Sequence, residues 1–307
     1  CVVVVVHPLL SPPYDWTMVK QHAATKTAPT LQEQLPELRD GQSVDLLKAL
    51  HILTRDGKLN QDSRRKLKQV YHLVQFIEPL IAAQHKERGA VTVVDHGAGK
   101  SYLGFILYDL VLKALDNGQV IGIETRSELV QSSQTLALQL GFERMAFHAL
   151  SVEQAMTSDA LPHKVDVVTA LHACDTATDD AIGFGLKHQA SAMVIVPCCQ
   201  AEMASVMRRQ KALNLSRTPL SELWRHPLHA REFGSQITNV LRCLRLEASG
   251  YQVTVTELVG WEHSMKNELI LAKRVGAPKA GAQQRIDDIL AEMGVPAMAS
   301  RFAGMAS

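Results

Sequence analysis

Two short segments of the chain hold several side chains that could take part in a reaction. One is a His-Ala-Cys-Asp sequence from His172 to Asp175, and the other is Pro197 followed by Cys198 and Cys199. A carboxylate or imidazole held beside a substrate can accept a proton. Asp175 is therefore a candidate base or amine acceptor, and His172 is a candidate contact to the substrate or cofactor.

Each of these residues also has a structural alternative. Asp175 could cap the helix that follows it, and His172 could bond to the backbone at the end of a strand. Cys198 and Cys199 could act as nucleophiles or bind zinc with Cys174 and His172. Adjacent cysteines without a Cys-x-x-Cys pair are poor zinc ligands. We therefore expect no metal, and we expect the two thiols and Pro197 to line the acceptor pocket.

A second candidate site follows an apolar run, where the chain reads Asp95-His-Gly97-Ala-Gly99. Two glycines between a strand and a helix let the backbone approach a ligand closely. A P-loop would need glycine at Val94, and a dinucleotide fingerprint would need glycine at Tyr102. The turn therefore excludes a P-loop, disfavours a dinucleotide and indicates another nucleotide-like ligand.

Glu124 ends the next apolar run and could accept hydrogen bonds from both hydroxyls of a ribose. The alternative is an ordinary exposed acid at a strand end. Together, Asp95, the Gly-x-Gly turn and Glu124 resemble the first two motifs of class I S-adenosylmethionine-dependent methyltransferases. Such folds often place an acid near the adenine amine, where this chain has Ser151. The expected cofactor-binding residues are Asp95, Gly97, Ala98, Gly99, Tyr102, Glu124, Thr125, Ser151, Val152 and His172.

Three longer segments of the sequence show a more specific resemblance. They read DHGAGKSYLGFIL, LHACDTATDDAI and VPCCQ. Together they resemble the methyltransferase domain 32 family, which includes a eukaryotic tRNA 2′-O-methylating enzyme, over about residues 60–275. The resemblance implies S-adenosylmethionine as the donor and RNA, either tRNA or rRNA, as the acceptor. The alternatives are methylation of a protein or small molecule, or a non-catalytic nucleotide-binding module.

The elements that position these residues follow from hydrophobic periodicity. Short apolar runs separated by helical stretches predict a parallel sheet with crossover helices. Two consecutive strands near the end predict an antiparallel hairpin. We expect a Rossmann-like, mostly parallel seven-stranded α/β sheet with a helical N-terminal extension. The predicted strands are 91–94, 120–123, 145–149, 165–170, 193–196, 251–259 and 268–273. Because ligands gather at the carboxyl ends of parallel strands, His172–Asp175 and Pro197–Cys199 should face each other across the cofactor.

The same pattern divides the chain into four parts. Residues 1–44 are rich in proline and polar residues and are expected to be irregular. Residues 45–88 are expected to form a helical cap of two amphipathic helices, and residues 89–275 the S-adenosylmethionine-binding domain. Residues 276–307 form a C-terminal tail with one expected helix.

Composition limits the kinds of partner. Lysine and arginine total 32 against 31 acidic residues, so no overall basic field attracts nucleic acid. An RNA partner would need a local patch, and the candidates are Arg208, Arg209, Lys211 and Arg225, which could equally form a solvated surface. Five cysteines, two of them adjacent, favour reduced thiols in the cytoplasm. No apolar run is long enough for a membrane span, and the pattern leaves the oligomeric state open.

Overall fold

A computed structural model describes residues 35, 37–171, 173–197, 201–209, 219–258 and 268–305. The contacts divide the chain into two units, residues 1–40 and residues 41–307. In the first unit, the Leu38 amide donates to the Leu35 carbonyl at 3.0 Å and closes a turn. The candidate site residues that are described belong to the second unit.

A seven-stranded sheet forms the centre of the second unit, in the order β3-β2-β1-β4-β5-β7-β6. The strands are β1 (Val91–His96), β2 (Gly118–Glu124), β3 (Met145–Ala149), β4 (Val167–Leu171), β5 (Ala192–Val196), β6 (Tyr251–Glu257) and β7 (Glu268–Arg274). Strands β1 to β5 pair in parallel, and β7 runs antiparallel to both β5 and β6. The expected fold class is therefore confirmed, including the terminal hairpin.

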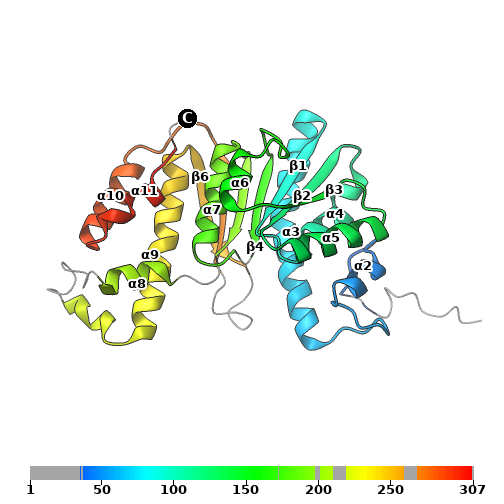
Figure 1. The fold of residues 1–307 in the computed structure, drawn as a ribbon, viewed down its shortest axis with the longest axis horizontal. Helices are drawn as coiled ribbons and strands as arrows, with labels where there is room; N and C mark the ends of the chain where they lie inside the picture. The colour runs from blue at the N-terminus through cyan, green and yellow to red at the C-terminus, as the bar shows by residue number, and fades with distance from the viewer. Residues whose placement is uncertain are drawn as a thin grey trace, which may run out of the picture. The chain divides into compact units, whose positions relative to one another are not determined.

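Helices cover both faces of this sheet (Figure 1). The α-helices are α2 (Val44–Ala49), α3 (Gln61–Arg88), α4 (Tyr102–Leu110), α5 (Ser127–Gln139), α6 (Val152–Thr157), α7 (Thr176–Lys187), α8 (Glu202–Arg209), α9 (Pro227–Ala248), α10 (Ala282–Glu292) and α11 (Ala299–Phe302). Short 3₁₀ turns lie at η1 (Leu112–Ala114), η3 (Pro219–Trp224) and η4 (Pro296–Met298). In Figure 1, α3, α4 and α5 lie on one side of the sheet, and α6, α7 and α9 lie on the other. Burial on both faces explains why the parallel strands read as nearly continuous apolar runs.

The two helices expected before the sheet are present, as α2 and α3. Asn60 caps the start of α3 by accepting from the Ser63 amide at 2.8 Å, as its short side chain suits it to do. Gly89 ends the helix in the left-handed conformation, which costs glycine little. The strand β1 begins two residues later, so α3 leads the chain directly into the sheet.

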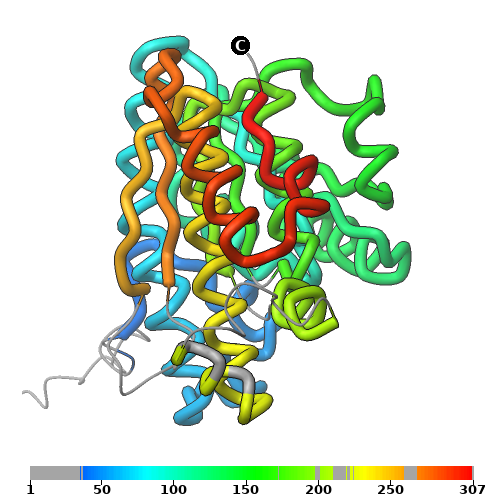
Figure 2. The backbone as a smooth tube through the Cα atoms, turned by 90° about the vertical axis from the view of Figure 1, so that its left-hand side faces the viewer, coloured from blue at the N-terminus to red at the C-terminus, as the bar shows by residue number. Residues whose placement is uncertain are grey.

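The C-terminal tail contains a second helix beyond the one expected. Besides α10, residues Ala299–Phe302 form α11, because Phe302 is buried together with Leu290 of α10 and Leu241 of α9. Figure 2 shows these C-terminal helices packed over α9. Among the helices of the described ranges, none is long and apolar enough to cross a membrane.

Candidate functional site

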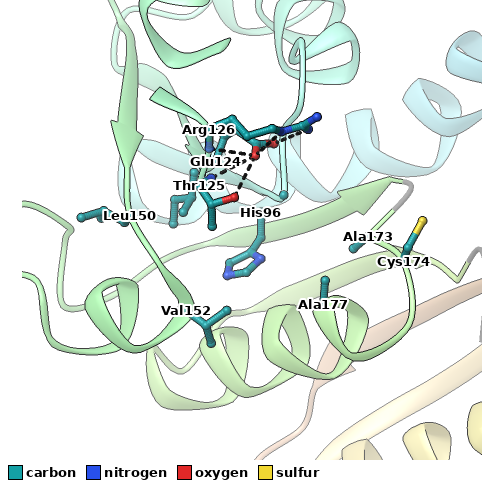
Figure 3. Close-up of a pocket in the computed structure, with 11 residues that line it drawn as sticks. His96, Glu124, Thr125, Arg126, Leu150, Val152, Ala173, Cys174 and Ala177 are labelled. Atoms are coloured by element: carbon teal, nitrogen blue, oxygen red, sulfur yellow. Dashed lines mark hydrogen bonds and ion pairs between the residues drawn. The ribbon is translucent and has the colours of Figure 1, made fainter. Parts of the chain in front are cut away.

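A pocket opens at the carboxyl ends of β1 and β2, where the predicted cofactor site lies (Figure 3). Strand ends, the following loops and the start of α7 all contribute to it. The lining residues are His96, Gly97, Ile123, Glu124, Thr125, Arg126, Leu150, Val152, Ala173, Cys174 and Ala177. This is the usual ligand position in an open parallel sheet.

The last two residues of β1 point to opposite faces of the sheet, as successive strand residues must. The Asp95 carboxylate accepts from Ser101, the residue that precedes α4, at 3.3 Å. The His96 ring instead packs against Phe184 of α7, with ring centroids 5.5 Å apart. Only His96 of the two lines the pocket. A contact between Asp95 and the cofactor stays a prediction.

Asp95 lies beneath the glycine turn and is only 3% exposed. Thr169 of β4 donates to its carboxylate at 2.9 Å. Burial raises the pKa of Asp95 to about 6, although hydrogen bonds from Thr169, Ser101 and the Gly104 backbone oppose that rise. Gly104 lets α4 approach this closely, because a Cβ there would lie 2.4 Å from the Ser101 hydroxyl oxygen.

The raised pKa of Asp95 makes a prediction for Asp95→Asn. The folded protein binds a proton on the Asp95 carboxyl group more tightly than the unfolded chain does. The stability that this protonation contributes is therefore fully present below pH 3.8 and is lost as the pH rises through about 6. The asparagine variant cannot titrate. From pH 4 to pH 7 its free energy of unfolding should rise relative to the native protein by about 2 to 3 kcal/mol. Urea denaturation across this range measures the difference, and a difference that does not change with pH contradicts the assignment.

The glycine turn and Glu124 are held together as the sequence suggests. Gly97 and Gly99 both have positive φ angles, 69° and 58°, which glycine adopts without strain. The Gly99 amide donates to the Glu124 carboxylate at 2.8 Å. Glu124 is 8% exposed, so the strand-end acid is buried at the pocket and is not an ordinary surface residue.

The Glu124 carboxylate is already well supplied with donors from this chain. Arg126 places Nε 3.0 Å and Nη2 3.1 Å from the two oxygens. The Thr125 and Arg126 amides and the Thr125 hydroxyl donate as well. Burial alone would raise the pKa of Glu124, but the hydrogen bonds from Arg126 and Gly99 outweigh it and lower the pKa to about 2. The carboxylate is therefore ionised at neutral pH.

The other predicted cofactor residues fall into two groups. Thr125 and Val152 line the pocket. Ser151 instead caps α6. Its hydroxyl accepts from the Gln154 backbone amide at 3.2 Å, and the Gln154 side-chain oxygen accepts from the Ser151 backbone amide at 2.8 Å. Ala98 lies in the glycine turn and Tyr102 begins α4, and neither is among the lining residues of the pocket.

Asp175 occupies the N-cap position of α7 but makes no side-chain capping bond. Its carboxylate accepts from the Glu202 amide at the start of α8, at 3.4 Å. Its backbone has φ 51° and ψ −119°, a conformation that is strained for any residue except glycine. Strain of this kind concentrates at functional sites and must be held by the surrounding structure.

Arg242 of α9 holds this strained segment, and the sequence analysis did not identify it. Its guanidinium donates to the Asp175 carbonyl at 2.8 Å and forms a two-pronged ion pair with Asp179 of α7, both bonds 2.8 Å long. Arg242 is fully buried. A buried arginine is rare unless it is paired, but its partner lies 63 residues earlier in the chain, so helical periodicity gives no signal for the pair.

Three of the predicted reaction residues, His172, Cys198 and Cys199, lie outside the described residues, and so does Lys211 of the basic patch. Their roles stay predictions. Cys174 is exposed and lines the pocket. Within the described ranges, no group of three histidine, cysteine or acidic residues is placed to hold a metal ion.

The pocket brings together three features that the sequence does not place side by side. They are Gly97 of the glycine turn, the ionised Glu124, and His96 with both ring nitrogens buried and unpartnered among the described residues. With the mostly parallel sheet and its antiparallel hairpin, these features define a Rossmann-like class I methyltransferase fold.

The comparisons with known proteins agree with this class. The model of the methyltransferase domain 32 family, described as a methyltransferase domain, matches residues 65–206. That segment, just under half of the chain, is thus similar to a methyltransferase domain.

Two curated relatives are similar to longer stretches of the chain. A glutathione S-transferase C-terminal domain-containing protein homolog from Drosophila pseudoobscura pseudoobscura is 25% identical over 263 residues, which cover 76% of this chain and 41% of the relative. The protein of that name from Bos taurus is 26% identical over 182 residues, covering 59% and 25%. The chain thus spans less than half the length of either relative.

Among solved structures, an O-methyltransferase from Bacillus cereus in complex with SAH is similar in fold. The similarity covers 80% of this chain and 97% of that one, with 12% identity and a TM-score of 0.47.

Proposed function

We propose that this chain transfers the methyl group of S-adenosylmethionine to RNA. The observation that supports the proposal is that the helix α8 begins beside Asp175 and ends at a basic surface. The amide of Glu202, the first residue of α8, donates to the Asp175 carboxylate, and the last turn carries Arg208 and Arg209. An eight-residue helix is about 12 Å long, so these arginines lie within a few nucleotides of Asp175.

The residues of the pocket would hold the donor. In this proposal Glu124 would accept hydrogen bonds from the ribose hydroxyls once the Arg126 guanidinium moves away, and Gly97 would allow close backbone approach. When bound, S-adenosylmethionine supplies an activated sulfonium methyl group, so the main task of the protein is to position the acceptor and exclude water.

Asp175 is the candidate base for an acceptor that must lose a proton. It follows β4, at the edge of the sheet where the pocket opens, and its neighbours Ala173, Cys174 and Ala177 line that pocket. Because its side chain does not cap α7, the carboxylate can face a substrate. A hydroxyl acceptor would need such a base.

The basic surface has a hollow suited to a phosphate group. Arg208 of α8 and Arg231 of α9 line it together with Leu228 and two small residues, Ala201 and Ala204. Arg225 lies near the start of α9 and pairs with Glu222 at 2.8 Å. Guanidinium groups bind phosphate oxygens in pairs of hydrogen bonds, so Arg208 and Arg231 are the proposed RNA contacts.

The acceptor is identified by incubating the chain with tritiated S-adenosylmethionine and cell extract. We expect label in RNA. Label in protein or in a small molecule would contradict the RNA acceptor, and donor binding without transfer would indicate a binding module.

The basic surface is tested with the double variant Arg208→Gln and Arg231→Gln, measured by RNA binding at several salt concentrations. The slope of log affinity against log salt should fall by about 1 to 2, since two phosphate contacts are lost. The matched control changes two exposed basic residues of α3, Arg65→Gln and Lys66→Gln, and should keep the native slope. Equal slopes in both variants would place the RNA elsewhere.

The two hydrogen bonds from the Arg126 guanidinium to the Glu124 carboxylate lead to a prediction about donor affinity. Each carboxylate oxygen offers about two acceptor positions, and those of Oε2 are taken by the Gly99 amide and by Arg126 Nη2. A ribose hydroxyl gains a position on Oε2 when the Arg126 guanidinium leaves, which its 59% exposed side chain permits. Arg126→Ala should strengthen binding of S-adenosylhomocysteine about two- to fivefold, whereas Glu124→Ala should weaken it by about 1 to 3 kcal/mol.

Isothermal titration calorimetry measures both affinities. In the double variant, removing Arg126 should bring no gain, because the acid it competes for is absent. Weaker binding in Arg126→Ala would show that the arginine supports the site, and unchanged binding in Glu124→Ala would remove Glu124 from it.

A further inference from the structure

His96 is the polar side chain buried deepest in the pocket. It is 5% exposed, and Figure 3 shows its ring pointing into the space between Thr125, Val152 and Ala177. Within the described part of the chain, neither ring nitrogen has a hydrogen-bond partner. Most buried polar atoms are hydrogen-bonded, and an unsatisfied one destabilises the fold. The two free nitrogens therefore call for a partner that enters the pocket.

The protonation state of His96 follows from its surroundings. Burial lowers its pKa to about 4, and the negative charge of Glu124 opposes that shift only partly. The other polar groups that line the pocket are Thr125, Arg126 and Cys174. The ring is neutral at pH 7, so it offers one N–H donor and one nitrogen acceptor.

The lining of the pocket is divided by chemistry. The charged Glu124 and Arg126 lie together after β2, where a sugar would bind. Apart from His96, Thr125, Cys174 and Gly97, the rest of the lining is apolar and consists of Ile123, Leu150, Val152, Ala173 and Ala177. An apolar slot with one polar group suits a flat heteroaromatic base that carries hydrogen-bonding atoms on its edge.

The residue expected at this position from the sequence is engaged elsewhere. Ser151 accepts from the Gln154 amide at 3.2 Å and donates to Glu153 at 2.9 Å. Both functions of its hydroxyl are thus used at the start of α6. His96 has its nitrogens available and lies inside the pocket.

We propose that His96 is a specificity residue that hydrogen bonds to the edge of the donor's adenine base. This inference rests on the proposed function, because it assigns the base end of the same pocket. His96 thus takes the place of the acid that other folds of this class use at the adenine.

The test compares two ligands by isothermal titration calorimetry. One is S-adenosylhomocysteine, and the other is its analogue with benzimidazole as the base, which has a similar shape but lacks the amine and the six-ring nitrogens. The native protein should prefer the adenine compound about tenfold or more. In His96→Phe that preference should disappear, while His188→Phe, a matched change of a buried histidine outside the pocket, should keep it.

The outcomes separate the inference from the proposed function. If the native protein binds neither ligand, both fail. If it binds and His96→Phe keeps the full preference, the inference alone fails and the donor site stands.

A second measurement needs no variant. In native protein with ¹⁵N-labelled histidine, the ring nitrogens of His96 should shift when S-adenosylhomocysteine is added, and shift much less with the benzimidazole analogue. Unchanged His96 nitrogens at saturating S-adenosylhomocysteine would overturn the inference, even if His96→Phe does not fold.

Discussion

Replacing Asp175 with alanine is expected to lower the rate of methyl transfer about 100- to 10,000-fold, the usual contribution of a positioned base. Donor affinity should change little, because the Asp175 side chain is not among the lining residues of the pocket. Single-turnover kinetics gives the rate and calorimetry gives the affinity. Full residual activity would show that Asp175 has only a structural role.

The strained backbone of Asp175 provides a control that separates function from stability. At φ 51° and ψ −119°, glycine is the residue that fits without strain. Asp175→Gly should therefore increase the free energy of unfolding by about 1 kcal/mol and still lose turnover. A variant that is more stable and inactive cannot owe its inactivity to unfolding. A less stable glycine variant would mean that the strain is absent.

Replacing Arg242 with alanine is expected to lower the free energy of unfolding by about 3 kcal/mol, because the buried Asp179 would lose its two-pronged ion pair and keep only the longer pair with Arg301, at 3.9 Å. Arg242 is fully buried, and Asp179 is 6% exposed. The same change frees the Asp175 carbonyl, so turnover should fall as well. Urea denaturation measures the stability.

The double variant Arg242→Met and Asp179→Leu tests the cause of that loss. It removes both charges and keeps most of the buried volume, so most of the stability should return. If it is as unstable as Arg242→Ala, the loss comes from packing or from the hydrogen bonds that Arg242 donates to the Asp175 carbonyl and, at 3.2 Å, to the Asn239 side-chain oxygen. The loss of the ion pair is then not the cause.

The strands could be predicted from the sequence because both faces of the sheet are covered. The apolar runs at 91–94 and 193–196 correspond to β1 and β5 within two residues, and both strands are largely buried. The consecutive strands β6 and β7 could be predicted because the polar stretch of sequence between the two apolar runs carries no helical pattern. Glu124 could be predicted because the end of β2 is a fixed position relative to the glycine turn.

The pairing of side chains could not be predicted in the same way. Arg126 pairs with Glu124 through a choice of side-chain conformation, which no spacing encodes. The second helix of the tail depends on Phe302 reaching α9, a contact between distant parts of the chain. His96 did leave a signal: it follows Asp95 in a strand, so it must face the opposite side of the sheet, toward α7.

The crystal structure of the chain with S-adenosylhomocysteine tests the central claim most directly. We predict that the ribose hydroxyls bind Glu124, with the Arg126 guanidinium displaced, and that the adenine edge contacts His96. A nucleoside bound away from β1 and β2 would contradict it. So would a nucleoside bound while the Arg126 guanidinium still bonds to Glu124.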